Sequence, residues 1–165
     1  MVAKPYTGSY DFSLERQDSL AAGKNFLTLY NPPSAGVLMT LTAAFVSYAS
    51  DTVSPSFTLR GFRIAAEPTG GTLHTAAEVC KFDTAHPDNE AVIRSNNPTV
   101  ALGAAFFNSP AGVEKKVMSE VHQIDAPPGF NPFLIRPGEG VVFRQAQGAV
   151  GHLWNFSIIW RELRA

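Results

Sequence analysis

The clearest pattern in the chain is an alternation of hydrophobic and polar positions near its C-terminus. From residue 152 to 161, one side of an extended chain would carry only large side chains: His152, Trp154, Phe156, Ile158 and Trp160. A period of two predicts a β-strand, because successive side chains of a strand point to opposite faces. Three aromatic side chains on one face can each bury roughly 150–250 Å². We therefore expect this face to pack against a second layer.

Two shorter apolar runs precede that strand. Pro137-Gly138-Glu139-Gly140 is suited to a turn and separates Phe133–Ile135 from Val141–Phe143. The resulting pattern predicts strands on both sides of the turn. We expect the segment from Asn131 to Leu163 to form the centre of one sheet.

Two further strands are predicted near the N-terminus. Tyr10, Phe12 and Leu14 alternate with polar residues, which is typical of a strand with one face in water. Residues 26–30 are apolar on both sides apart from Thr28, which predicts a strand inside a sheet. The chain therefore begins with one half-buried strand and one fully buried strand.

A proline-rich loop follows these strands. Within Asn31–Gly36, Pro32 and Pro33 must end the preceding strand, because proline fixes φ and has no amide to donate to a ladder. We expect a hairpin-like loop here. The long apolar run at residues 36–50 predicts the next strand.

The apolar positions change phase between residues 57 and 64. Phe57 and Leu59 share one parity, whereas Phe62 and Ile64 share the other. A single extra residue at a glycine re-aims a strand in this way, so we predict a β-bulge at Arg60-Gly61. Weaker patterns predict short strands within residues 73–82, 91–94 and 99–107.

Residues 113–124 fit two periods. Val113, Val117, Val121 and Ile124 have helical spacing, while Met118, Glu120 and His122 fit a strand. We favour a strand, because valine loses rotamer freedom in helices and the surrounding segments are β.

Eight to ten predicted strands, separated by turn signals and without a long helix, define the fold class. The sequence predicts an all-β protein, an antiparallel β-sandwich, with the jelly roll as the preferred version. We expect residues 10–165 to form a single domain. Residues 1–9, which include Lys4, Pro5 and Gly8, predict an extended N-terminal arm.

Charge excludes some classes of partner. The chain has 13 basic and 14 acidic residues, a formal net charge of −1, and only 16% charged residues. Neither nucleic acid nor a membrane surface is an expected partner, because no block of basic residues is present. A surface of low charge suits protein contacts; an ordinary compact β domain is the alternative.

No apolar run reaches the roughly 18 residues of a membrane span. The single cysteine, Cys80, is expected to be a small buried residue.

A search for catalytic chemistry gives mostly negative results. The four histidines (His74, His86, His122 and His152) have no metal-ligand spacing, and we expect no metal and no cofactor. The acidic run at 83–90 could bind calcium, but it lacks the alternating ligands of an EF-hand and fits a solvated loop better. There is no nucleophile-elbow, phosphate-loop or dinucleotide motif. Trp154 and Trp160 could stack on sugars, but they lie on an apolar strand face and are expected in the core.

Two segments resemble small structural proteins of tailed bacteriophages. The first is LTLYNPPSAGVLMTLTAAFVSYAS at residues 27–50, and the second is FLIRPGEGVVFRQ at 133–145 followed by WNFSIIWREL at 154–163. The second segment is similar to the C-terminal hairpin of those proteins. The resemblance implies a capsid decoration, or cement, protein, often a jelly roll, that binds the outside of the shell. It implies the major capsid protein and further copies of this chain, as a dimer or trimer, as partners, and a location on the virion exterior after synthesis in the host cytoplasm. No functional residue transfers from that family.

The candidate interface lies in the arm and in two proline-rich loops. We expect preorganised loops to contact a partner at little ordering cost. The residues concerned are Pro5, Tyr6, Asn31, Pro32, Pro33, Pro127, Pro128 and Phe130. Two other hypotheses remain open: a phage tail, fibre or carbohydrate-binding module, and a hydrolase in which His122 or His152 meets a carboxylate and a nucleophile.

Overall fold

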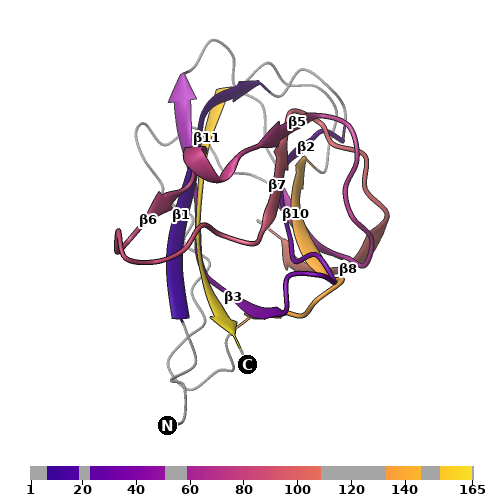
Figure 1. Ribbon diagram of the computed structural model, residues 1–165. Helices are drawn as coiled ribbons and strands as arrows, with labels where there is room; N and C mark the ends of the chain where they lie inside the picture. Colours follow the sequence, from indigo (N-terminus) through magenta and orange to yellow (C-terminus); the bar gives the residue numbers. More distant parts are fainter. Residues whose placement is uncertain (1–6, 19–22, 51–58, 109–132, 146–152, 165) are drawn as a thin grey trace, which may run out of the picture.

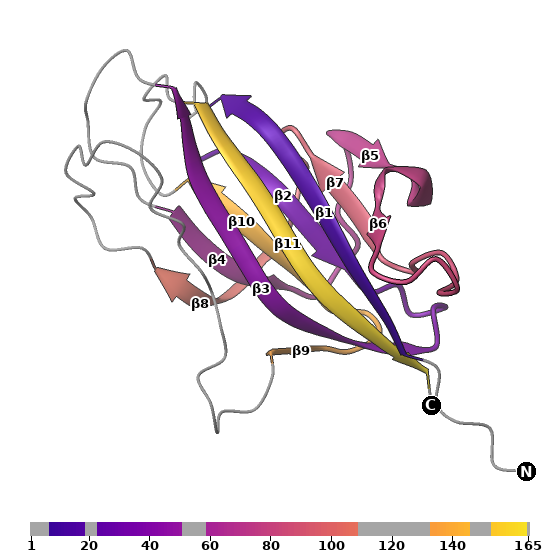
Figure 2. The same cartoon turned by 90° about the vertical axis from the view of Figure 1, so that its left-hand side faces the viewer.

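Two antiparallel sheets packed face to face make up the protein in a computed structural model, which describes residues 7–18, 23–50, 59–108, 133–145 and 153–164 (Figure 1; Figure 2). Sheet A has the strand order β6-β1-β11-β3-β9. Its strands are β1 (Thr7–Asp18), β3 (Val37–Ser50), β6 (Cys80–Lys81), β9 (Phe133–Ile135) and β11 (Leu153–Arg164). Sheet B has the order β5-β7-β2-β10-β4-β8. Its strands are β2 (Asn25–Tyr30), β4 (Leu59–Ile64), β5 (Thr72–His74), β7 (Val92–Ser95), β8 (Leu102–Asn108) and β10 (Gly140–Gln145).

Strand pairing follows a nested pattern. β1 pairs with β11, β2 with β10, β3 with β9 and β4 with β8, all antiparallel. Consecutive members of this set alternate between the two sheets. β5, the short 3-10 helix η1 (Ala76–Glu78), β6 and β7 are inserted between β4 and β8. The predicted all-β antiparallel sandwich is confirmed, and η1 is the only helix in the described part of the chain.

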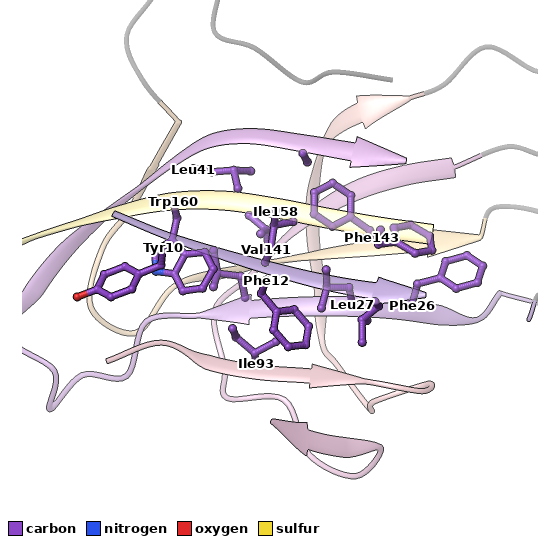
Figure 3. Packing of buried hydrophobic residues seen from close by; sticks show 14 of the residues in the cluster. Tyr10, Phe12, Phe26, Leu27, Leu41, Ile93, Val141, Phe143, Ile158 and Trp160 are labelled. Carbon is purple, nitrogen blue, oxygen red and sulfur yellow. The ribbon is translucent and has the colours of Figure 1, made fainter. Parts of the chain in front are cut away.

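The core lies between the sheets and is centred on β11. The even residues from Trp154 to Trp160 are buried as the alternation predicts, with Trp160 fully enclosed and Trp154 8% exposed. The Trp160 ring stacks on Tyr10 of β1 at 5.5 Å between centroids, and Phe156 stacks on Phe26 of β2 at 4.8 Å. Figure 3 shows Tyr10, Ile158 and Trp160 of sheet A in one cluster with Leu27, Val141 and Phe143 of sheet B. Each buried aromatic or aliphatic side chain contributes roughly 1.5–3 kcal/mol, so this face of β11 binds the two layers together.

Two connections that we expected within one sheet instead pass between sheets. The Pro137–Gly140 turn leaves β9 in sheet A and enters β10 in sheet B, so the C-terminal segment supplies the centre of both sheets and not of one. The Asn31–Gly36 loop likewise joins β2 in sheet B to β3 in sheet A and is not a hairpin. Turn-forming residues mark where a strand ends, but they do not specify whether the next strand pairs with it.

The predicted bulge at Arg60-Gly61 is wrong. β4 stays in unbroken register with β10 from Leu59 to Ile64. The register shifts lie on the other side, where β8 skips residues against β4. The phase change has another cause: Leu59 packs in the main core, whereas Ile64 and Phe62 pack with Tyr30 and Val142 in a second cluster on the outer face of sheet B. Gly61 is needed for space, since a Cβ there would lie 2.6 Å from the Phe106 ring.

The structure corrects three further predictions, which concern Cys80, residues 73–82 and the N-terminal arm. Cys80 is exposed and not buried, because it lies in the two-residue edge strand β6. The weak strand expected at residues 73–82 is divided into β5, η1 and β6 by a capping box between Thr75 and Glu78. Thr7 to Ser9, which we assigned to the arm, belong to β1 and pair with β11. The remaining arm residues and the ambiguous segment at 113–124 lie outside the described residues.

Candidate functional site

The predicted interface residues fall into two groups. Pro5, Tyr6, Pro127, Pro128 and Phe130 lie outside the described residues, as do His122 and His152. Asn31, Pro32 and Pro33 lie in the loop between β2 and β3. Because Val37 pairs with Arg164 and Thr7 with Leu163, this loop is at the end of the sandwich where β1 begins and β11 ends (Figure 2).

Asn31 fixes this loop from inside the fold. Its side chain is fully buried, and its Nδ2 donates to the carbonyls of Val37 at 2.8 Å and Ile135 at 3.1 Å. Its backbone N–H donates to Glu139 O, and its carbonyl accepts from the Gly138 N–H. Three of these four hydrogen bonds tie the β2–β3 loop to the end of β9 and the β9–β10 turn, and the fourth, to Val37, closes the loop itself. Asn31 positions the loop and does not offer its side chain to a partner.

The two tied turns present an exposed surface. Pro33 and Ser34 are exposed in the first turn, and Arg136 and Pro137 are exposed in the second. The turns are adjacent, since a Cβ on Gly138 would lie 3.8 Å from Pro33. Pro32 is half-buried, and its carbonyl accepts from the Ala35 N–H at 3.0 Å. This surface is rigid before any partner arrives, and our sequence analysis had missed its second half.

A third segment, residues 82–91, is docked at the same end by Glu162. The Glu162 carboxylate is 4% exposed and accepts from the Glu90 N–H with both oxygens, at 3.1 and 3.0 Å. It also accepts from Trp160 Nε1 at 3.0 Å. Burial raises the pKa of Glu162, and these hydrogen bonds oppose the rise in part. The sequence signal was available: Glu162 has the inward parity of Trp160.

Further contacts fasten the same segment to β1 and β11. Tyr10 Oη donates to the Pro87 carbonyl at 3.3 Å, and the Ser9 N–H donates to His86 Nδ1 at 3.3 Å. Glu90 forms an ion pair with Arg164. The acidic run that we considered for calcium is therefore a docked loop with its own internal partners. In the part of the chain that the structure describes, no group of three or more metal-ligating side chains is present.

Serine, histidine and glutamate side chains form a hydrogen-bonded series at the edge of sheet B that β5 and β7 form. His74 Nε2 is 2.7 Å from Ser95 Oγ, and His74 Nδ1 is 2.9 Å from Glu78 Oε1. Hydrogen bonds from the Thr75 backbone and from His74 lower the pKa of Glu78 to about 2. These distances are those of a hydrolase triad. Our sequence analysis missed the group, because the three residues share no motif and meet only through pairing of β5 with β7.

The serine of this series is too deeply buried to act as a nucleophile. Ser95 is 3% exposed and shares the inward parity of Ile93. The His74 ring lies against Phe12 of β1, with centroids 4.6 Å apart. No substrate reaches Ser95 Oγ in this arrangement, and moving β5 to admit one would carry His74 away with it. The series satisfies a partly buried histidine at the edge of the core.

Comparisons with known proteins add no relatives. No family model, no curated protein and no solved structure matches the chain. Among the described residues, no helix is both long and apolar enough to cross a membrane.

Proposed function

We propose that this protein is a virion decoration protein, a non-enzymatic cement that binds the outside of a tailed-phage capsid and stabilises it. Its partners are the major capsid protein and further copies of this chain, and its place is the capsid exterior. The proposal starts from the resemblance of residues 27–50, 133–145 and 154–163 to structural proteins of tailed phages. The observation that carries it further is the rigid turn surface at one end of a two-layered sandwich.

The jelly roll is part of this proposal. In a jelly roll, a long antiparallel ribbon of eight strands is rolled into two sheets. The nested pairs β1–β11, β2–β10, β3–β9 and β4–β8, with successive strands in alternate sheets, support that assignment. β5, η1, β6 and β7 then form an insertion in the middle of the ribbon.

Rigidity is the physical requirement of a cement. A clamp resists expansion of a shell only if it loses little freedom on binding and deforms little afterwards. The Asn31 hydrogen bonds and the Glu162 contacts hold three surface segments in place at one end of the sandwich. Tight anchoring of those segments supports a role in adhesion.

Two alternatives receive less support. A sugar-binding face needs exposed tryptophan or tyrosine rings. The rings that the structure describes, those of Trp154, Trp160, Tyr10 and Tyr30, are buried. A hydrolase needs a reachable nucleophile, and in the one serine–histidine–glutamate series among the described residues Ser95 is enclosed. The tail or fibre role shares the adhesive chemistry and is separated from the head role by the binding test.

Co-sedimentation with assembled shells tests the proposal. Purified protein is mixed with shells of the major capsid protein encoded in the same genome, and with unassembled subunits as a control. We expect saturable binding to shells. Absence of binding to shells, or binding to tail structures alone, would contradict the decoration role.

A further inference from the structure

Arginines gather on the outer face of sheet B. Leu59 and Gly61 of β4 face the core, so Arg60 points outward, and the same alternation places Arg144 of β10 outward beside Phe143. Arg60 and Arg144 are direct cross-strand partners in the β4–β10 ladder. Arg94 lies on the same outer face, on β7.

Among the described residues, no carboxylate forms an ion pair with Arg60 or Arg144. Like charges directly opposite each other in a sheet are destabilising. The arginine ion pairs within the described ranges are Arg63 with Glu139 and Arg164 with Glu90, and neither includes the pair. Arg60 is exposed and makes no side-chain hydrogen bond with any described residue. Within the described structure, no ion pair offsets the repulsion between these two cations.

Contacts with Asn25 and Gly23 position the Arg144 side chain before any ligand binds. Its Nη1 donates to Asn25 Oδ1 at 3.2 Å. Its guanidinium also lies over Gly23, where an added Cβ would come within 2.6 Å of Nη2. Gly23 has a φ of +62°, so the missing side chain serves both the turn and the arginine. A guanidinium placed in advance loses less entropy when it binds.

We propose that Arg60 and Arg144 form a docking site for carboxylates on an acidic protein surface. Two arginines that face each other in the β4–β10 ladder can each bind a carboxylate of such a surface, because arginine binds carboxylate oxygens in a bidentate fork. A nucleic acid is the poorer match, since a chain of net charge −1 with three arginines on this face neutralises few phosphates. The identity of the partner rests on the proposed function: the acidic surface belongs to the capsid shell.

Charge reversal at Arg60 tests the site with a matched control. Arg60→Glu is compared with Arg161→Glu, which reverses an exposed arginine on β11 in sheet A. Each substitution changes the formal net charge from −1 to −3, because a positive charge is exchanged for a negative one. Thermal melting of both variants establishes that each is folded. Binding is measured by co-sedimentation with shells, and by nuclear magnetic resonance of the arginine Nε–H signals during titration with a hexaglutamate peptide.

We expect Arg60→Glu to bind shells roughly tenfold more weakly or worse, because reversal sets like charges against each other across the interface. Arg161→Glu keeps wild-type affinity, and hexaglutamate shifts the Arg144 signal in the wild type but not in Arg60→Glu. Equal shell binding by both variants overturns the site while leaving the decoration role intact. If the wild type binds no shells, the decoration role fails and the peptide titration alone decides the site. Tighter binding of a single-stranded oligonucleotide than of hexaglutamate, or self-association lost only in Arg60→Glu, overturns the acidic partner.

Discussion

Asn31→Ala is expected to destabilise the protein strongly although it removes only a small polar side chain. The substitution deletes two hydrogen bonds, from Asn31 Nδ2 to the carbonyls of Val37 and Ile135. Both acceptor residues are buried, Val37 at 2% and Ile135 at 0% exposure. A buried polar group left without its partner costs about 1–3 kcal/mol, so the two together cost about 2–6 kcal/mol.

One effect reduces this cost. Asn31 Oδ1 is itself buried without a partner among the described residues, and its removal relieves that desolvation. We therefore expect a loss of about 2–4 kcal/mol, which is a large share of a typical total of about 5–15 kcal/mol. For a chain of 165 residues, the midpoint of thermal unfolding would fall by about 5–15 °C.

Urea unfolding followed by tryptophan fluorescence measures this loss, because Trp154 and Trp160 are buried reporters. Ser34→Ala in the same loop is the control: Ser34 is exposed, and its substitution should change stability by no more than about 0.5 kcal/mol. The midpoint should fall for Asn31→Ala with an unchanged slope. If Asn31→Ala is as stable as Ser34→Ala, Asn31 does not tie the turns, and the rigid turn surface loses its basis.

Three further substitutions or reagents test other parts of the structure. Gly61→Ala should cost about 1–3 kcal/mol in urea unfolding, because its Cβ meets the Phe106 ring at 2.6 Å, and the cost should shrink in a Phe106→Ala background. Burial raises the pKa of Glu162 above its ordinary value of 4.5, so the folded state holds this proton more tightly and wild-type stability should fall relative to Glu162→Gln as pH rises above about 4.5. A constant difference between pH 4.5 and 8 would contradict that sign. A fluorophosphonate probe should leave Ser95 unlabelled, and labelling found by mass spectrometry would contradict the non-enzymatic role.

Alternation in the sequence was sufficient to predict the parts of the fold that have one core and one wet face. β11 keeps its parity from Trp154 to Glu162 and β1 from Tyr10 to Leu14, with Trp160 and Tyr10 facing the same interior. The register of β1 against β11 shifts after Leu14, which the alternation did not predict. Parity was misleading in β4, because Phe62 and Ile64 pack in an outer cluster that no single-core pattern anticipates. Turn residues likewise located Asn31–Gly36 and Pro137–Gly140 but could not specify a crossing between sheets.

Candidate functional residues were harder to predict, because they depend on contacts between distant segments. Asn31 contacts Ile135, which lies 104 positions away in sequence. Glu162 shows its inward parity in the sequence, but its partner Glu90 is 72 positions away. The Arg60–Arg144 pair exists only through the register of β4 with β10. None of these pairings has a local motif, so they became visible only when the strands were paired.

Measuring the heat stability of shells with and without the protein is the most direct test of its proposed role. Shells saturated with the protein and shells lacking it are heated in parallel, and the temperature at which they release packaged DNA is followed with an intercalating dye. A cement should raise that temperature, and the increase should follow occupancy of the shell. Release at the same temperature from saturated and bare shells would contradict the stabilising role.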